Sequence, residues 1–269
     1  MKNMMTAFAA ISLALGVTAC GDNGDADTDV AASDGTITGT WLIDADTAEF
    51  EGATTEILLA DGTYECMSCN PPYSVTANGE WQDVDLPGAD ALMVEVVDDN
   101  SVRTAGSFGG EEQGSSVWTV SEDGQTVTIE FTDTSGDEVV TGSQMMTRAG
   151  DGPEGSHVLS GQWETQGVSG ISDAGLTVSY AVEGDQFTTS GNGFSYTATI
   201  GGEPVPVEGS NAGNMAAVES TGENSYLITN SRDGETLSTT ELTVDGDSLS
   251  GVNTNMSNGG VVRWTAARE

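Results

Sequence analysis

Residues 64–75, YECMSCNPPYSV, are the part of this chain whose residue types and spacing look most like chemistry. Two residues separate Cys66 from Cys69, a spacing found in redox-active dithiols, in zinc half-sites and in short structural disulfides. A redox-active pair normally sits at a helix N-terminus, whereas a strand-like segment precedes this pair and two prolines follow it. A zinc site needs about two further Cys or His ligands, which the surrounding domain lacks. A structural disulfide is therefore favoured, with a redox-active pair and a metal half-site as the alternatives.

The second half of the chain supports the structural interpretation. When Gly79 is aligned with Gly202, the segment CMSCNPP lies opposite TSGNGF, a turn rich in glycine. The first half then replaces a glycine turn with a turn that a disulfide holds and prolines end.

Other catalytic side chains are scarce. Lys2 is the only lysine, and the one histidine, His157, lies in the Gly-rich segment GDGPEGSHV. Serine and cysteine nucleophiles usually need a neighbouring base. We therefore predict no catalytic residues, no cofactor and no metal site, and hence a protein that is not an enzyme; an unrecognised hydrolase or isomerase is a remote alternative.

The N-terminus predicts an exported protein. One positive charge is followed by an apolar run and by small residues, which is typical of a secretory signal peptide over residues 1–19. The sequence VTAC at 17–20 resembles the lipobox of bacterial lipoproteins, in which the cysteine carries the lipid, here Cys20. Gly21 after it implies, by the same resemblance, an outer membrane lipoprotein. Residues 20–35 are acidic and lack aromatic residues, as expected of a disordered tether.

The charge balance excludes one class of partner and predicts a saline source. After removal of residues 1–19 the chain keeps five arginines against 43 acidic residues. Nucleic acid and anionic head groups both require a basic surface, so neither is expected as a partner. Self-repulsion on this scale destabilises a compact state unless salt screens it. We therefore expect a marine or otherwise saline source.

An internal repeat divides the chain. ITGTWLI at 37–43 matches LSGQWET at 159–165, and the closing segments MMTRAG and WTAARE also match. The repeat predicts domains at 36–149 and 158–269, joined by a linker at 150–157. Short runs of alternating apolar residues separated by Asp-Gly turns predict seven to nine strands in each half.

Two tandem antiparallel up-and-down β barrels are the expected fold, because closure removes the exposed edges of so long a meander. Within each barrel the first and last strands become neighbours. We therefore expect Arg148 to lie over Trp41, and Arg268 over Trp163, as cation–π contacts that close one end of each barrel. The five tryptophans are expected to be core residues. Two ordinary β sandwiches are the alternative.

The sequence resembles uncharacterised bacterial envelope proteins with two lipocalin-like repeats. The likeness rests on GTW at 39–41, DGTYECMSCNPPYSV at 61–75, NGEW at 78–81 and GPEGSHVLSGQW at 152–163, and it extends over almost all of residues 36–269. It implies lipocalin-like barrels in the cell envelope and no particular activity.

These observations predict a lipid-anchored envelope protein facing the periplasm or the cell surface, attached to the membrane through Cys20. Its barrels are expected to act as binding or interaction modules. A barrel of about eight strands either encloses one small ligand or is filled by side chains. A small apolar ligand in a barrel and contact with another envelope protein through filled barrels are the two alternatives.

Overall fold

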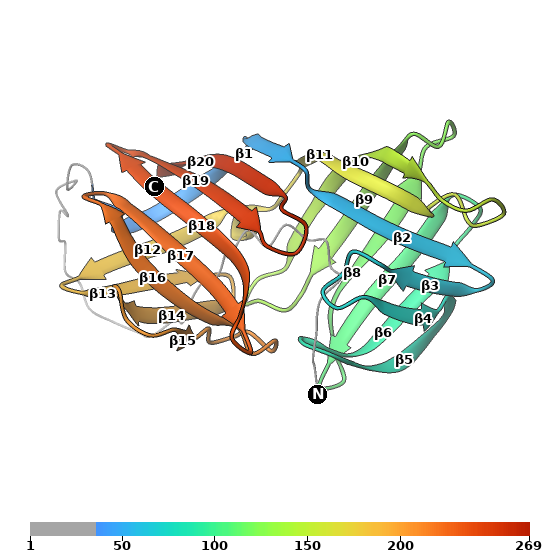
Figure 1. Cartoon of the computed structure of the whole chain (residues 1–269), viewed down its shortest axis with the longest axis horizontal. Coiled ribbons are helices and arrows are strands. Elements are labelled where there is room, and N and C mark those ends of the chain that lie inside the picture. The colour runs from blue at the N-terminus through green and yellow to red at the C-terminus, as the bar shows by residue number, and fades with distance from the viewer. Residues whose placement is uncertain (1–35) are drawn as a thin grey trace.

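The computed structural model describes residues 36–269 and contains two antiparallel sheets of ten strands, each curled into a nearly closed barrel (Figure 1). The predicted signal peptide, Cys20 and the acidic tether lie outside the described residues. The prediction of two β barrels in one chain is confirmed. The predicted strand number was too low, because β3, β4 and β15 are only two to four residues long and carry too few residues to show alternation.

The first barrel consists of consecutive strands: β2 (Thr54–Ala60), β3 (Thr63–Cys66), β4 (Tyr73–Thr76), β5 (Asn78–Leu86), β6 (Ala89–Val96), β7 (Ser101–Phe108), β8 (Glu111–Val120), β9 (Thr126–Asp133), β10 (Val140–Asp151) and β11 (Gly161–Ser169). Each strand pairs with the next, except at the junction of β4 and β5, and β11 pairs with β2 to close the meander. At the junction, the side-chain amide of Gln82 accepts a hydrogen bond from Thr76 N and donates one to Thr76 O. The Gln82 side chain thus replaces part of the backbone hydrogen bonding that is absent between β4 and β5.

The second barrel consists of β1 (Gly39–Glu51), β12 (Thr177–Glu183), β13 (Gln186–Gly191), β14 (Phe194–Thr199), β15 (Val205–Pro206), β16 (Met215–Gly222), β17 (Ser225–Arg232), β18 (Glu235–Asp245), β19 (Ser248–Asn255) and β20 (Val261–Arg268), with the 3-10 turn η1 (Asp173–Gly175) before β12. A bridge between Ser195 and Glu208 links β14 to the segment after β15.

The position of β1 is the main departure from the predicted organisation. β1 lies between β20 and β12, so the first strand of the N-terminal half completes the barrel of the C-terminal half. In the same way β11, the first strand of the second repeat, completes the first barrel between β10 and β2. The two first strands therefore exchange places, and they cross between the barrels at the top of Figure 1.

The predicted boundaries at 36–149 and 158–269 are therefore wrong for the first strand of each half. The segment 150–157 is also not a linker between domains. β10 continues to Asp151, and the loop 152–160 returns the chain to β11, which pairs with β10, so this segment is part of a hairpin inside the first barrel.

Alternating inward side chains fill both barrels. The first barrel is packed around Trp118, Trp163, Tyr64 and Met146, and the second around Trp41, Trp264, Phe187 and two tyrosines. Trp81 on β5 is the exception to the predicted tryptophan cores, since 46% of its surface is exposed. β5 pairs only with β6 and has a mostly exposed burial pattern, so its alternation does not place Trp81 inside the barrel.

Candidate functional site

An arginine covers a tryptophan in each barrel. Arg268 lies over the ring of Trp41, with its guanidinium carbon 4.2 Å from the ring centroid, and Arg148 lies over Trp163 at 4.1 Å. The four predicted residues therefore form the contacts, but the predicted partners are wrong. The reason is the strand exchange, which places each tryptophan beside the last strand of the other repeat.

These arginines also bind backbone carbonyls. Arg148 donates to the carbonyls of Gly124, Val158 and Ser160, and Arg268 donates to those of Thr36 and Thr38. Burial lowers the pKa of Arg148 below its ordinary value. With the guanidinium donors used to tie strands and loops together, both arginines act in closing the barrel ends.

The glycine of each Gly-x-Trp motif makes room for this arginine. Gly39 and Gly161 have φ angles of 139° and 130°, which disfavour residues with a side chain. A Cβ atom at either position would lie 2.6 to 2.7 Å from Nη1 of the arginine. The motif is thus a structural requirement of the closed end.

The two cysteines form a disulfide in the structure, which confirms the favoured prediction. Cys66 ends β3 in the core, and the turn then exposes Met67, whose backbone N–H donates to Glu56 O at 2.9 Å. Ser68 Oγ accepts a further hydrogen bond from Glu56 N. The disulfide turn is therefore fixed against β2 on the side that pairs with β3, with Met67 47% exposed.

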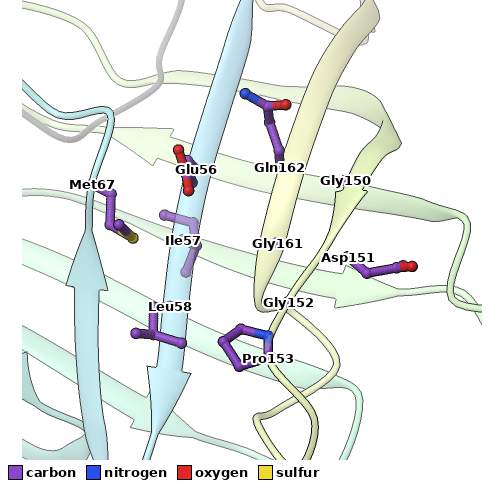
Figure 2. A pocket seen from close by; sticks show the side chains of 10 residues that line it. All are labelled: Glu56, Ile57, Leu58, Met67, Gly150, Asp151, Gly152, Pro153, Gly161 and Gln162. Atoms are coloured by element: carbon purple, nitrogen blue, oxygen red, sulfur yellow. The ribbon is translucent and has the colours of Figure 1, made fainter.

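A groove of about 590 Å³ opens to solvent beside this turn. Figure 2 shows Met67 on one side of β2 and Pro153 on the other. We name this surface the β2–β11 groove; it is lined by Glu56, Ile57, Leu58, Met67, Gly150, Asp151, Gly152, Pro153, Gly161 and Gln162. Three of these residues are glycines, of which Gly150 and Gly152 are partly exposed, and two are acidic. Apolar side chains and backbone groups with acidic neighbours suit an extended peptide segment.

A second hollow, of about 280 Å³, also opens to solvent and lies between the barrels. We name it the inter-barrel cleft; it is lined by Asp85, Leu86, Pro87, Asn211, Ala212, Gly213, Arg232 and Asp233. Neither hollow is a closed barrel interior.

Three tyrosines, Tyr64, Tyr180 and Tyr196, are core residues. Burial raises the pKa of Tyr64 and Tyr180 well above the ordinary value, and raises that of Tyr196 to about 12. Phenols with such pKa values stay protonated at neutral pH. They fill space in the barrels and are poor candidates for acid–base chemistry.

His157 has a structural role. Its Nδ1 accepts a hydrogen bond from Leu159 N, which leaves the proton on Nε2, and Nε2 donates to the carbonyl of Asp98 at 3.1 Å. Both ring nitrogens are thus occupied by backbone groups. The ring fastens the β10–β11 hairpin to the β6–β7 turn.

Within residues 36–269, no group of three or more His, Cys, Asp or Glu side chains has an arrangement that could hold a metal ion. In the same part of the chain, no helix has the length and apolar character needed to cross a bilayer.

Sequence reasoning missed both hollows. Their residues come from distant segments, and no local pattern marks them.

Comparison with known proteins adds no relative: no family model, no curated protein and no solved structure matches this chain.

Proposed function

We propose that this protein is a lipid-anchored envelope protein without enzymatic activity, whose two filled barrels form a rigid module that binds another envelope protein. The filling of the barrels carries the proposal. Trp41, Trp163, Tyr64 and Phe187 are at most 2% exposed and occupy the space that a carried ligand would need. This packing supports the interaction role over transport of a small apolar molecule.

The proposed binding surface is the β2–β11 groove. The disulfide turn already holds the backbone of Met67 in place, so binding of a partner there would lose little conformational entropy. Glu56 and Asp151 line the same groove and favour a partner segment that carries basic residues. We therefore propose an extended segment with an apolar side chain and neighbouring lysine or arginine as the bound element.

The membrane attachment in this proposal rests on the sequence. A lipid on Cys20, followed by the acidic segment 20–35, would let the barrels reach a partner at the membrane surface. The two cysteines of the disulfide are consistent with an oxidising compartment such as the envelope.

Photo-cross-linking in the host cell tests the proposal. A Met67→p-benzoylphenylalanine variant is expected to give a discrete adduct with one envelope protein. Met256 is a matched control, because it is a methionine of similar exposure, 54%, on the second barrel. The same substitution at Met256 should give no such adduct. Absence of a protein adduct at position 67, or equal labelling at both positions, would contradict the proposal.

A further inference from the structure

Arg232 differs from the other arginines whose partners are described. Arg263 pairs with Glu51 at 3.1 Å, Arg268 pairs with Asp247 at 3.4 Å, and Arg148 donates to three carbonyls. Arg232 is only 8% exposed, yet no carboxylate among residues 36–269 lies within ion-pair distance of it. The one hydrogen bond of its side chain in the described structure is a long one, 3.4 Å from Nη1 to Asn214 Oδ1.

Arg232 is one of the residues that line the inter-barrel cleft. This residue ends β17, and the cleft is completed by the β5–β6 turn of the first barrel and by the β15–β16 loop of the second. These turns approach each other at the lower middle of Figure 1. Asn211 of the loop also donates to Gln113 of the first barrel at 3.4 Å. A guanidinium has five donors in a fixed fork, so the cleft offers unused donors that suit a carboxylate.

Two carboxylates restrict what such a ligand can be. Asp85 and Asp233 line the same cleft, and the chain as a whole has a formal charge of −37. A simple anion would be repelled by this field, whereas a molecule with an ammonium group beside its carboxylate is neutral overall and can bind both signs of charge. No aromatic residue lines the cleft, so recognition of a quaternary ammonium through π faces is not expected.

We propose that the inter-barrel cleft binds a small zwitterion, such as an α-amino acid, with its carboxylate on Arg232 and its ammonium group on Asp85 and Asp233. The volume of about 280 Å³ suits a molecule of that size. This site lies apart from the β2–β11 groove and does not depend on the function proposed above.

Calorimetric titration of the purified protein, in a buffer free of zwitterions, tests the proposal. Glycine and L-alanine should bind saturably. Acetate and methylamine should bind at least about tenfold more weakly, because each lacks one half of the recognition. Glycine betaine should also bind at least about tenfold more weakly, because its quaternary nitrogen has no N–H to donate to the two carboxylates. Failure of both amino acids to bind the wild-type protein would overturn the proposal.

Variants assign the binding to this cleft. Arg232→Gln should weaken amino acid binding by about tenfold or more. Arg263→Gln, which changes an exposed arginine elsewhere, should leave binding unchanged. If Arg232→Gln does not fold, as judged by circular dichroism, Arg232→Lys replaces it and should weaken binding measurably. Unchanged binding in the folded Arg232 variant would refute the site.

The double variant Asp85→Asn/Asp233→Asn tests the ammonium half. With both carboxylates removed, acetate should bind at least as well as in the wild-type protein and the preference for amino acids should be lost. A preference for amino acids that survives this change would also refute the proposed geometry.

Discussion

Replacing Trp41 tests the strand exchange most sharply. Trp41 is fully buried, its Nε1 donates to Ile37 O at 2.8 Å, and Arg268 covers its ring. Truncation of a buried tryptophan to alanine costs about 3–5 kcal/mol. The lost contact with Arg268 accounts for about 0.5–2 kcal/mol of this. Trp41→Ala should therefore destabilise the second barrel, although Trp41 belongs to the N-terminal half of the sequence.

Hydrogen exchange followed by mass spectrometry locates the effect. Since each 1.4 kcal/mol is a factor of ten, amides in β12, β19 and β20 should lose about two to four orders of magnitude of protection. Amides in β6 to β9 of the first barrel should change little. Trp163→Ala is the matched variant, and it should loosen β2 and β10 instead. If Trp41→Ala loosens mainly the first barrel, the reasoning from the exchanged strands is refuted.

An engineered disulfide gives a second test of the strand exchange. Thr40 Oγ1 and Ser179 Oγ lie 2.9 Å apart across β1 and β12. Thr40→Cys/Ser179→Cys should therefore form a disulfide when the protein is made in an oxidising compartment. In the structure Glu56 of β2 faces Gln162 of β11. Thr40 is the residue of the first repeat that matches Gln162, so without strand exchange Thr40 would face Glu56 instead. Thr40→Cys/Glu56→Cys should stay reduced, and the opposite pattern in peptide maps would contradict the topology.

Three further predictions concern stability. The double variant Cys66→Ser/Cys69→Ser should lose about 2 kcal/mol and reduce exchange protection in β3 and β4, because the disulfide closes only a short loop; unchanged protection there would contradict its role. The melting temperature should rise between low salt and 1 M NaCl, where the Debye length falls to about 3 Å, and a flat or falling value would remove the argument from charge. The free energy of unfolding should fall above about pH 10, because the unfolded state then loses tyrosine protons that the folded state keeps until the pKa of Tyr196 near 12 is reached. This one group contributes about 2 kcal/mol to the loss by that pH. Ionisation of the buried tyrosines, seen in the tyrosine absorbance before any unfolding, would contradict this prediction.

Much of the fold was predictable because local patterns determine it. Alternating apolar residues and Asp-Gly turns predict hairpins, and two equivalent Gly-x-Trp segments predict two similar barrels. The choice between self-closure and exchange was not predictable in this way. Because the repeats match at Trp41 and Trp163, either tryptophan provides the same contact for Arg148 or Arg268. The loop 152–160 lets β11 fold back on β10, and β1 is then left to complete the other barrel.

The candidate sites were less predictable than the fold. The disulfide follows from two cysteines with few competing roles, and the structure contains it. The groove beside it depends on Gly150–Pro153 approaching β2 only through the pairing of β2 with β11. The cleft at Arg232 depends on how two barrels lie against each other. Neither property is carried by a run of neighbouring residues, so no motif could indicate them.

Native mass spectrometry of the protein extracted gently from its own membranes tests the proposed function most directly. We expect a chain that begins at Cys20 and carries lipid, bound to one protein partner, with no apolar small molecule retained in the barrels. An apolar molecule bound in stoichiometric amount and released only on unfolding, in the absence of any protein partner, would contradict the interaction role and support a carrier instead.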